Sequence, residues 1–128
     1  MKIVALIARI LLGLVFVVFG ANAFLHFIPM GPMPTGIAGQ YMGALFAAHY
    51  MYPVGFIMVA GGLLLLVGLY VPLGLVLLGP ILVNILLFHL LMAPQTIGMG
   101  LFCTLLWLLI FWRVRSAFYP IFCPRVTQ

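Results

Sequence analysis

The sequence contains no Asp and no Glu, and its charged side chains are five Lys and Arg residues. Charged residues therefore make up 4% of the 128-residue chain, and hydrophobic residues make up 68%. A soluble domain carries about 25% charged residues, because its surface must face water. So few charges cannot cover a water-facing surface, and most of the surface must therefore contact lipid. The sequence predicts an all-α integral membrane protein.

Four long apolar segments predict transmembrane helices. They cover approximately residues 3–27, 52–69, 73–92 and 98–118. Each approaches or exceeds the roughly 17–25 residues that a spanning helix needs. Pro72 and Pro94 lie in the later breaks, and Pro29 ends the first segment. We expect a single transmembrane domain over residues 1–128, folded as a four-helix bundle.

Two parts of the N-terminal half need a separate interpretation. Lys2 and Arg9, followed by an apolar run and Ala21-Asn22-Ala23, have the pattern of a signal peptide with its cleavage site. Because the run stays apolar to Phe27, we interpret it as a retained spanning helix. Residues 37–50 predict a short outer helix that lies in the membrane interface between the first and second spans.

The basic residues predict the orientation of the chain. All five lie near its two ends: Lys2, Arg9, Arg113, Arg115 and Arg125. Basic residues favour the cytoplasmic side, and four spans place both ends on one side. We expect a multi-pass protein of the bacterial inner (plasma) membrane, with both termini cytoplasmic and with membrane lipid around it. The charges form no basic stripe with readout residues, so we expect no nucleic acid partner.

Polar residues gather toward the outer side of this topology. Asn22 and His26 are four residues apart and share a face of the first helix. His49 lies in the interfacial segment, Asn84 near the middle of the third span and His89 near its outer end. We predict that these five residues line an outer-side ligand pocket. The alternative is that they join helices by hydrogen bonds or reach the wet interface.

The residue types limit what such a pocket can bind. Without carboxylates the chain offers no carboxylate acid/base pair and no acidic site for magnesium or calcium. No catalytic residue and no metal ligand is predicted, and we expect no stand-alone enzyme activity. Histidine can hydrogen-bond a quinone carbonyl, which makes quinone the favoured cofactor. Histidines near Met30 and Met33 leave a haem- or copper-binding protein as an alternative.

Glycines predict where helices approach one another. Gly13 and Gly20, seven residues apart, share one face of the first helix, and this face points away from Asn22. Small residues allow close helix packing in lipid. This face can therefore contact a second copy of the chain or a partner membrane subunit, as in a scaffold or assembly protein. Two neighbouring helices of the same bundle are the alternative.

Three runs of sequence resemble the DoxX-like family. They are ARILLGLVFVVFGANAFLHFIP (Ala8 to Pro29), GGLLLLVGLYVPLGLVLLGPILVNILLFHLLMAP (Gly61 to Pro94) and WRVRSAF after the last span. The resemblance implies a four-helix membrane fold and a membrane subunit associated with quinone or a redox complex, as the family takes its name from a subunit of a thiosulfate:quinone oxidoreductase. Many members carry an acidic or amide residue just before the paired glycines, where this chain has Met58.

Overall fold

The computed structural model describes residues 2–25 and 35–125. Its elements, in order, are α1 (Lys2–Leu25), α2 (Gly36–Ala47), α3 (Met51–Val67), α4 (Val71–Met92), the 3₁₀ helix η1 (Pro94–Thr96), α5 (Gly98–Val114) and the 3₁₀ helix η2 (Arg115–Phe122). No strand occurs among these residues, so the all-α prediction is confirmed for them.

The helix boundaries follow the apolar segments closely. α3 and α4 each begin within two residues of the expected position, and α2 is the expected short helix between the first two spans. The last segment differs, because the α-helix ends at Val114 and the chain continues as a 3₁₀ helix rather than as an α-helix to residue 118. Residues 26 and 27 of the first predicted span lie outside the described residues.

Three or four helices are long and apolar enough to cross a membrane. By length and composition these are α1, α4 and the continuous helical segment Gly98–Phe122. α3 has only 17 residues. Together with α2 it makes a fourth candidate, although the two helices are bent by 87° relative to each other. The described helices are therefore compatible with a multi-pass membrane protein.

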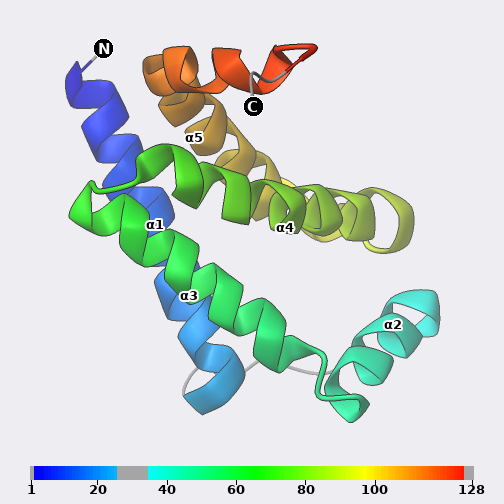
Figure 1. Ribbon diagram of the computed structural model, residues 1–128. Helices are drawn as coiled ribbons and strands as arrows, with labels where there is room; N and C mark the ends of the chain where they lie inside the picture. The colour runs from blue at the N-terminus through cyan, green and yellow to red at the C-terminus, as the bar shows by residue number, and fades with distance from the viewer. Residues whose placement is uncertain (1, 26–34, 126–128) are drawn as a thin grey trace.

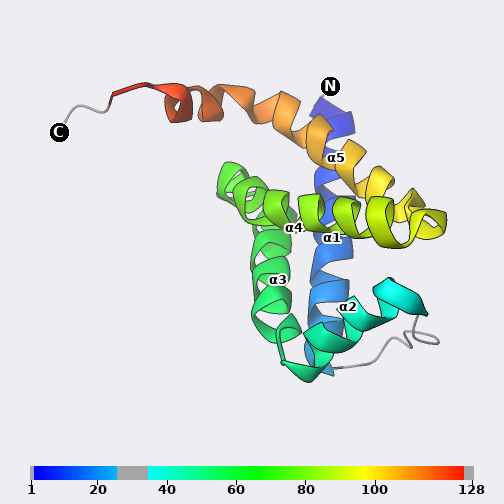
Figure 2. The same cartoon turned by 90° about the vertical axis from the view of Figure 1, so that its right-hand side faces the viewer.

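α1 and α3 run side by side in opposite directions, whereas α4 runs across them (Figures 1 and 2). The arrangement thus departs from a bundle in which each helix lies alongside the next. The turn between α3 and α4 explains the change of direction, because Gly68 (φ 77°) and Tyr70 (φ 54°) both take left-handed backbone conformations. α5 then returns from the far end of α4 toward the end of the molecule where α1 begins (Figure 2).

Paired glycines join α1 to α3 at two levels. A Cβ atom at Gly13 would lie 2.8 Å from the carbonyl oxygen of Gly62, and a Cβ atom at Gly20 would lie 2.8 Å from that of Gly55. Neither distance leaves room for a methyl group, so the two backbones are in direct contact. The Gly13 and Gly20 face therefore packs against α3 of the same chain, as in the alternative of neighbouring helices within one bundle.

Gly61 and Gly62 contact different neighbouring helices. Gly62 faces α1, whereas a Cβ atom at Gly61 would lie 2.8 Å from the Leu78 side chain and 3.4 Å from the Gly74 carbonyl oxygen of α4. Adjacent helical residues point about 100° apart. Two consecutive glycines thus allow α3 to contact α1 and α4 at the same level.

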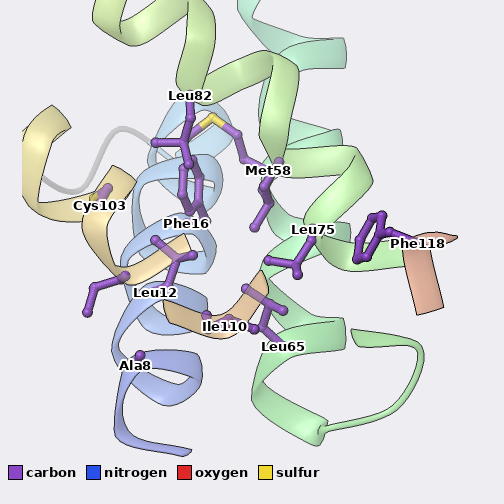
Figure 3. Packing of buried hydrophobic residues seen from close by; sticks show 12 residues of the cluster. Ala8, Leu12, Phe16, Met58, Leu65, Leu75, Leu82, Cys103, Ile110 and Phe118 are labelled. Atoms are coloured by element: carbon purple, nitrogen blue, oxygen red, sulfur yellow. The ribbon is translucent and has the colours of Figure 1, made fainter. Parts of the chain in front are cut away.

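The core lies where α1, α3, α4 and α5 meet (Figure 3). Phe16, Met58 and Leu82 converge there from three different helices (Figure 3). Met58 stands where the DoxX-like resemblance implies a polar residue. Its side chain is buried among apolar neighbours. Outside the core, large apolar side chains are exposed along all four long helices, such as Phe56 at 68% and Leu91 at 75%. Such surfaces match lipid rather than water.

Candidate ligand site at the corner between α2 and α3

His49 forms the corner at which α2 ends and α3 begins. Its φ of 57° is left-handed. The N–H of Tyr50 donates to the Leu45 carbonyl at 2.9 Å, and the N–H of His49 donates to the Phe46 carbonyl at 3.2 Å. These two bonds are the Schellman pattern that ends a helix, and the residue in the left-handed position is usually glycine. A side chain there costs roughly 1–2 kcal/mol, so His49 occupies this corner at an energetic cost.

Three aromatic rings stack beside this corner. His49 stacks on Tyr52 with ring centroids 5.6 Å apart and planes 5° from parallel. Tyr52 stacks in turn on Phe24 of α1, at 5.5 Å and 21°. The stack therefore connects the corner to the C-terminal end of α1. The side chain of His49, at the other end of the stack, is exposed.

A hollow of about 240 Å³ lies at the same corner. We name it the corner hollow, and its lining residues are Ala23, Phe46, His49, Met51 and Tyr52. Its surface combines aromatic and thioether groups with one imidazole. It can therefore accept a flat, mostly apolar group and offer that group a hydrogen bond.

The other predicted site residues lie in different surroundings. Asn22 is 5% exposed, is engaged in a contact within the chain and does not line the corner hollow. The Asn84 side chain is exposed, and its Nδ2–H donates to the Pro80 carbonyl at 3.1 Å. His89 is half-buried, with Nδ1 2.8 Å from the Ile85 carbonyl oxygen. His26 lies outside the described residues.

The described residues thus bring one predicted site residue, His49, to a hollow. Asn84 and His89 each bond a carbonyl four residues earlier on their own helix, which satisfies a side chain but does not build a pocket. They are five residues apart, about 140° around the helix, so they do not share a face. Whether Asn22, His26, Asn84 or His89 bind a ligand stays a prediction.

Sequence reasoning missed the aromatic residues of the corner, Phe24, Phe46 and Tyr52. A signal was present, because Tyr52 follows His49 by three residues just before the proline near the start of α3. The N–H of Tyr52 donates to the His49 carbonyl at 3.3 Å, and this turn brings the two rings together.

The described residues contain no group of three or more His or Cys side chains that could hold a metal ion. The two cysteines, Cys103 and Cys123, are both free. His26, Met30 and Met33, on which the haem or copper alternative rests, lie outside the described residues.

Comparison with known proteins leaves the chain without an assigned family. No family model matches it, and no curated protein and no solved structure matches it either. The resemblance to the DoxX-like family accordingly stays a prediction from the three runs of sequence.

Proposed function

We propose that this chain is a multi-pass membrane protein that binds a quinone headgroup in the corner hollow, as a non-catalytic membrane subunit of a redox system. One observation carries the proposal: a histidine occupies a left-handed corner position that favours glycine, and it faces a hollow lined by aromatic rings. Side chains held at such a cost cluster at functional sites.

The size and chemistry of the corner hollow favour a single ring. Its volume of about 240 Å³ is below the roughly 300–1,000 Å³ of pockets that enclose whole drug-sized ligands. It therefore suits a headgroup whose tail remains in lipid. The His49–Tyr52 stack offers a flat aromatic edge, and an imidazole N–H can donate to a quinone carbonyl. The link to a redox system rests on the resemblance of Ala8–Pro29 and Gly61–Pro94 to the DoxX-like family.

The proposed topology has four spans, α1, α3, α4 and α5, with α2 at the outer surface of a bacterial inner membrane and both termini cytoplasmic. Because α4 runs across α1 and α3 (Figures 1 and 2), these spans must be tilted from the membrane normal in different directions. The support for this topology is the distribution of charge, since the start of α1 and the end of α5 carry the basic residues and lie at one end of the molecule (Figure 1). The corner hollow is at the other end of α1, in the outer half of this topology. A scaffold that assembles with a partner subunit is the second function that this topology allows, but the glycine faces proposed for it are occupied within the chain.

The test is native mass spectrometry of the protein from mild detergent, after incubation with a short-chain ubiquinone. His49→Phe keeps a ring in the stack and removes both ring nitrogens. We expect it to weaken quinone binding about tenfold, because one hydrogen bond in a half-enclosed site contributes about 1.5 kcal/mol. His89→Phe is the matched control, since His89 does not line the corner hollow.

Equal binding by the wild type, His49→Phe and His89→Phe would remove the corner hollow as the site. Binding lost only in His89→Phe would move the site to the end of α4. No binding of quinone by any form, together with a co-purified partner protein, would favour the scaffold function.

A further inference from the structure

A second hollow lies at the opposite end of α1 from the corner hollow. It has a volume of about 330 Å³, and three of its lining residues are cationic: Lys2 and Arg9 of α1 and Arg113 of α5. Leu6, Val71 and Val114 are among the apolar residues of its wall. We name it the basic hollow. It forms where the start of α1, the start of α4 and the end of α5 come together, and Figure 2 shows the end of α5 close to the start of α1.

The cations of the basic hollow have no acidic side chain to pair with, because the chain contains no Asp and no Glu. Within the described residues, Nε of Arg9 is buried and has no hydrogen-bond partner. A buried, charged donor without a partner is unfavourable, since it has lost its water and gained nothing in exchange. The Arg9 guanidinium therefore carries a positive charge that no acidic side chain offsets.

Packing holds the Arg9 side chain in place. A Cβ atom built at Gly68 would collide with the Arg9 guanidinium, so this group lies directly against the backbone of the turn between α3 and α4. A guanidinium that is already positioned loses little freedom when it binds, and its planar fork matches two oxygens of a phosphate.

Arg115, two residues after Arg113, has interaction partners within the chain. Its Nη1–H donates to the Trp112 carbonyl at 2.6 Å, and its guanidinium carbon lies 4.1 Å from the centre of the Trp112 ring. Arg115 does not line the basic hollow. The chain thus provides internal partners for one arginine near the basic hollow, whereas Nε of Arg9 has none among the described residues.

We propose that the basic hollow binds a phosphate group, and that its source is the headgroup of an anionic phospholipid. The apolar half of the wall favours a lipid over free phosphate. Leu6, Val71 and Val114 provide surface for the first carbons of the acyl chains, and the exposed apolar side chains of α1, such as Ile3 and Ile7, continue it. This proposal does not depend on quinone binding, because the two hollows lie at opposite ends of α1 and share no lining residue.

The experiment measures retained phospholipid by native mass spectrometry. The protein is taken from nanodiscs of phosphatidylcholine containing one-fifth phosphatidylglycerol. We expect the wild type to retain phosphatidylglycerol, and Arg9→Gln and Arg113→Gln to lose about tenfold or more of it, because each removes a charge-assisted bond to phosphate. Arg9→Lys keeps the positive charge and removes the planar fork of the guanidinium. Its retention of phosphatidylglycerol should therefore lie between that of the wild type and that of Arg9→Gln.

Arg125→Gln is the matched control. It removes one positive charge from the C-terminal part of the chain, and Arg125 does not line the basic hollow. A second arm compares thermal unfolding in pure phosphatidylcholine nanodiscs with sodium phosphate and with sodium chloride at equal ionic strength. A shift caused by phosphate, present in the wild type and absent in Arg9→Gln, together with no selective lipid retention, would assign the site to free phosphate and overturn the lipid headgroup. Equal retention by Arg9→Gln and Arg125→Gln, with no phosphate effect, would overturn the site itself.

Circular dichroism of each variant separates a lost site from a lost fold. If Arg9→Gln does not fold, Arg113→Gln decides, because Arg113 is exposed on α5 and is not part of the core.

Discussion

Trp107 is the residue whose side chain hydrogen-bonds α5 to α4. Its Nε1–H donates to the Leu75 carbonyl at 3.0 Å, and its ring lies against Gly79 and stacks on Phe111 with centroids 5.4 Å apart. The acceptor is five residues before Pro80, which lies inside α4 and donates no N–H to the helix. The bond thus reinforces α4 close to the point where its own hydrogen-bond ladder is weakened.

Replacing Trp107 by Phe should lower the free energy of unfolding by about 0.5–1.5 kcal/mol, toward the lower end of that range in a membrane-like solvent. The change keeps an aromatic ring beside Phe111 and removes the donor. Titration with sodium dodecyl sulfate, followed by far-ultraviolet circular dichroism, measures the effect. Trp112→Phe is the control, because Trp112 is 56% exposed and lies outside the core. Equal losses in the two variants would argue that ring size, not the hydrogen bond, stabilises this contact.

The position of a residue along its helix did not predict whether its side chain is buried. Asn84 lies near the middle of α4, yet its side chain is exposed and bonds its own helix, whereas Asn22 near the end of α1 is buried. In a water-soluble helix the apolar stripe identifies the buried face. α4 is apolar on all sides, because lipid accepts Leu as readily as the protein core does, so its residue pattern could not show which face packs.

At the scale of helices, glycine supplied the information that hydrophobicity could not. The boundaries of α3 and α4 were predicted to within two residues, because Gly68, Pro72 and Pro94 interrupt continuous apolar runs. The shared face of Gly13 and Gly20 correctly indicated a close contact. The spacing left open whether a helix of the same chain or of a partner faces it, since spacing along one helix does not reveal its neighbour. The course of α4 across α1 and α3 depends on left-handed Tyr70, which no pattern indicated.

Replacing a glycine by alanine should have opposite effects on stability in α3 and in α2. Gly62→Ala places a Cβ atom 2.8 Å from the Gly13 carbonyl oxygen and 2.9 Å from a methyl group of Val17. We expect it to destabilise the protein by about 1–3 kcal/mol, as overpacked contacts do. Gly43→Ala of α2 meets nothing within 4 Å, and alanine favours a helix by about 0.5–1 kcal/mol over glycine.

Thermal unfolding in detergent compares these two variants directly. The expected order of melting temperatures is Gly43→Ala at or slightly above wild type, and Gly62→Ala clearly below it. If both variants melt with the wild type, the backbones of α1 and α3 are not in the contact described here.

At the scale of the whole molecule, the two native cysteines provide a test of the proposed topology. Cys123 is exposed near the end of the chain, and Cys103 is only 4% exposed in the core. A membrane-impermeant maleimide should therefore label Cys123 in inside-out vesicles and leave intact spheroplasts unlabelled. In a Cys123→Ser background, Thr35→Cys should show the reverse, since Thr35 is exposed and precedes α2, which the proposed topology places at the outer surface.

Labelling of both positions from one side would contradict the proposed orientation of α2 relative to the C-terminal end. The proposed orientation follows from where Lys and Arg stand in the sequence, and it stays a prediction. The two hollows were not predictable, because each is formed by residues from different helices, such as Ala23 with His49 and Arg9 with Arg113.

The glycine contacts have a mechanical consequence. Gly13–Gly62 and Gly20–Gly55 touch at two points seven residues apart, about 10 Å along the axis. Two fixed points define a line, so α1 and α3 form a strut whose register and crossing angle are both set. α4 crosses α3 of this strut at Gly61 and Gly74, and the side chains of Leu65 and Leu78 pack around the crossing. α5 packs against α1 of the strut as well as against α4, to which Trp107 bonds it, so this second attachment sets the angle at which α4 crosses.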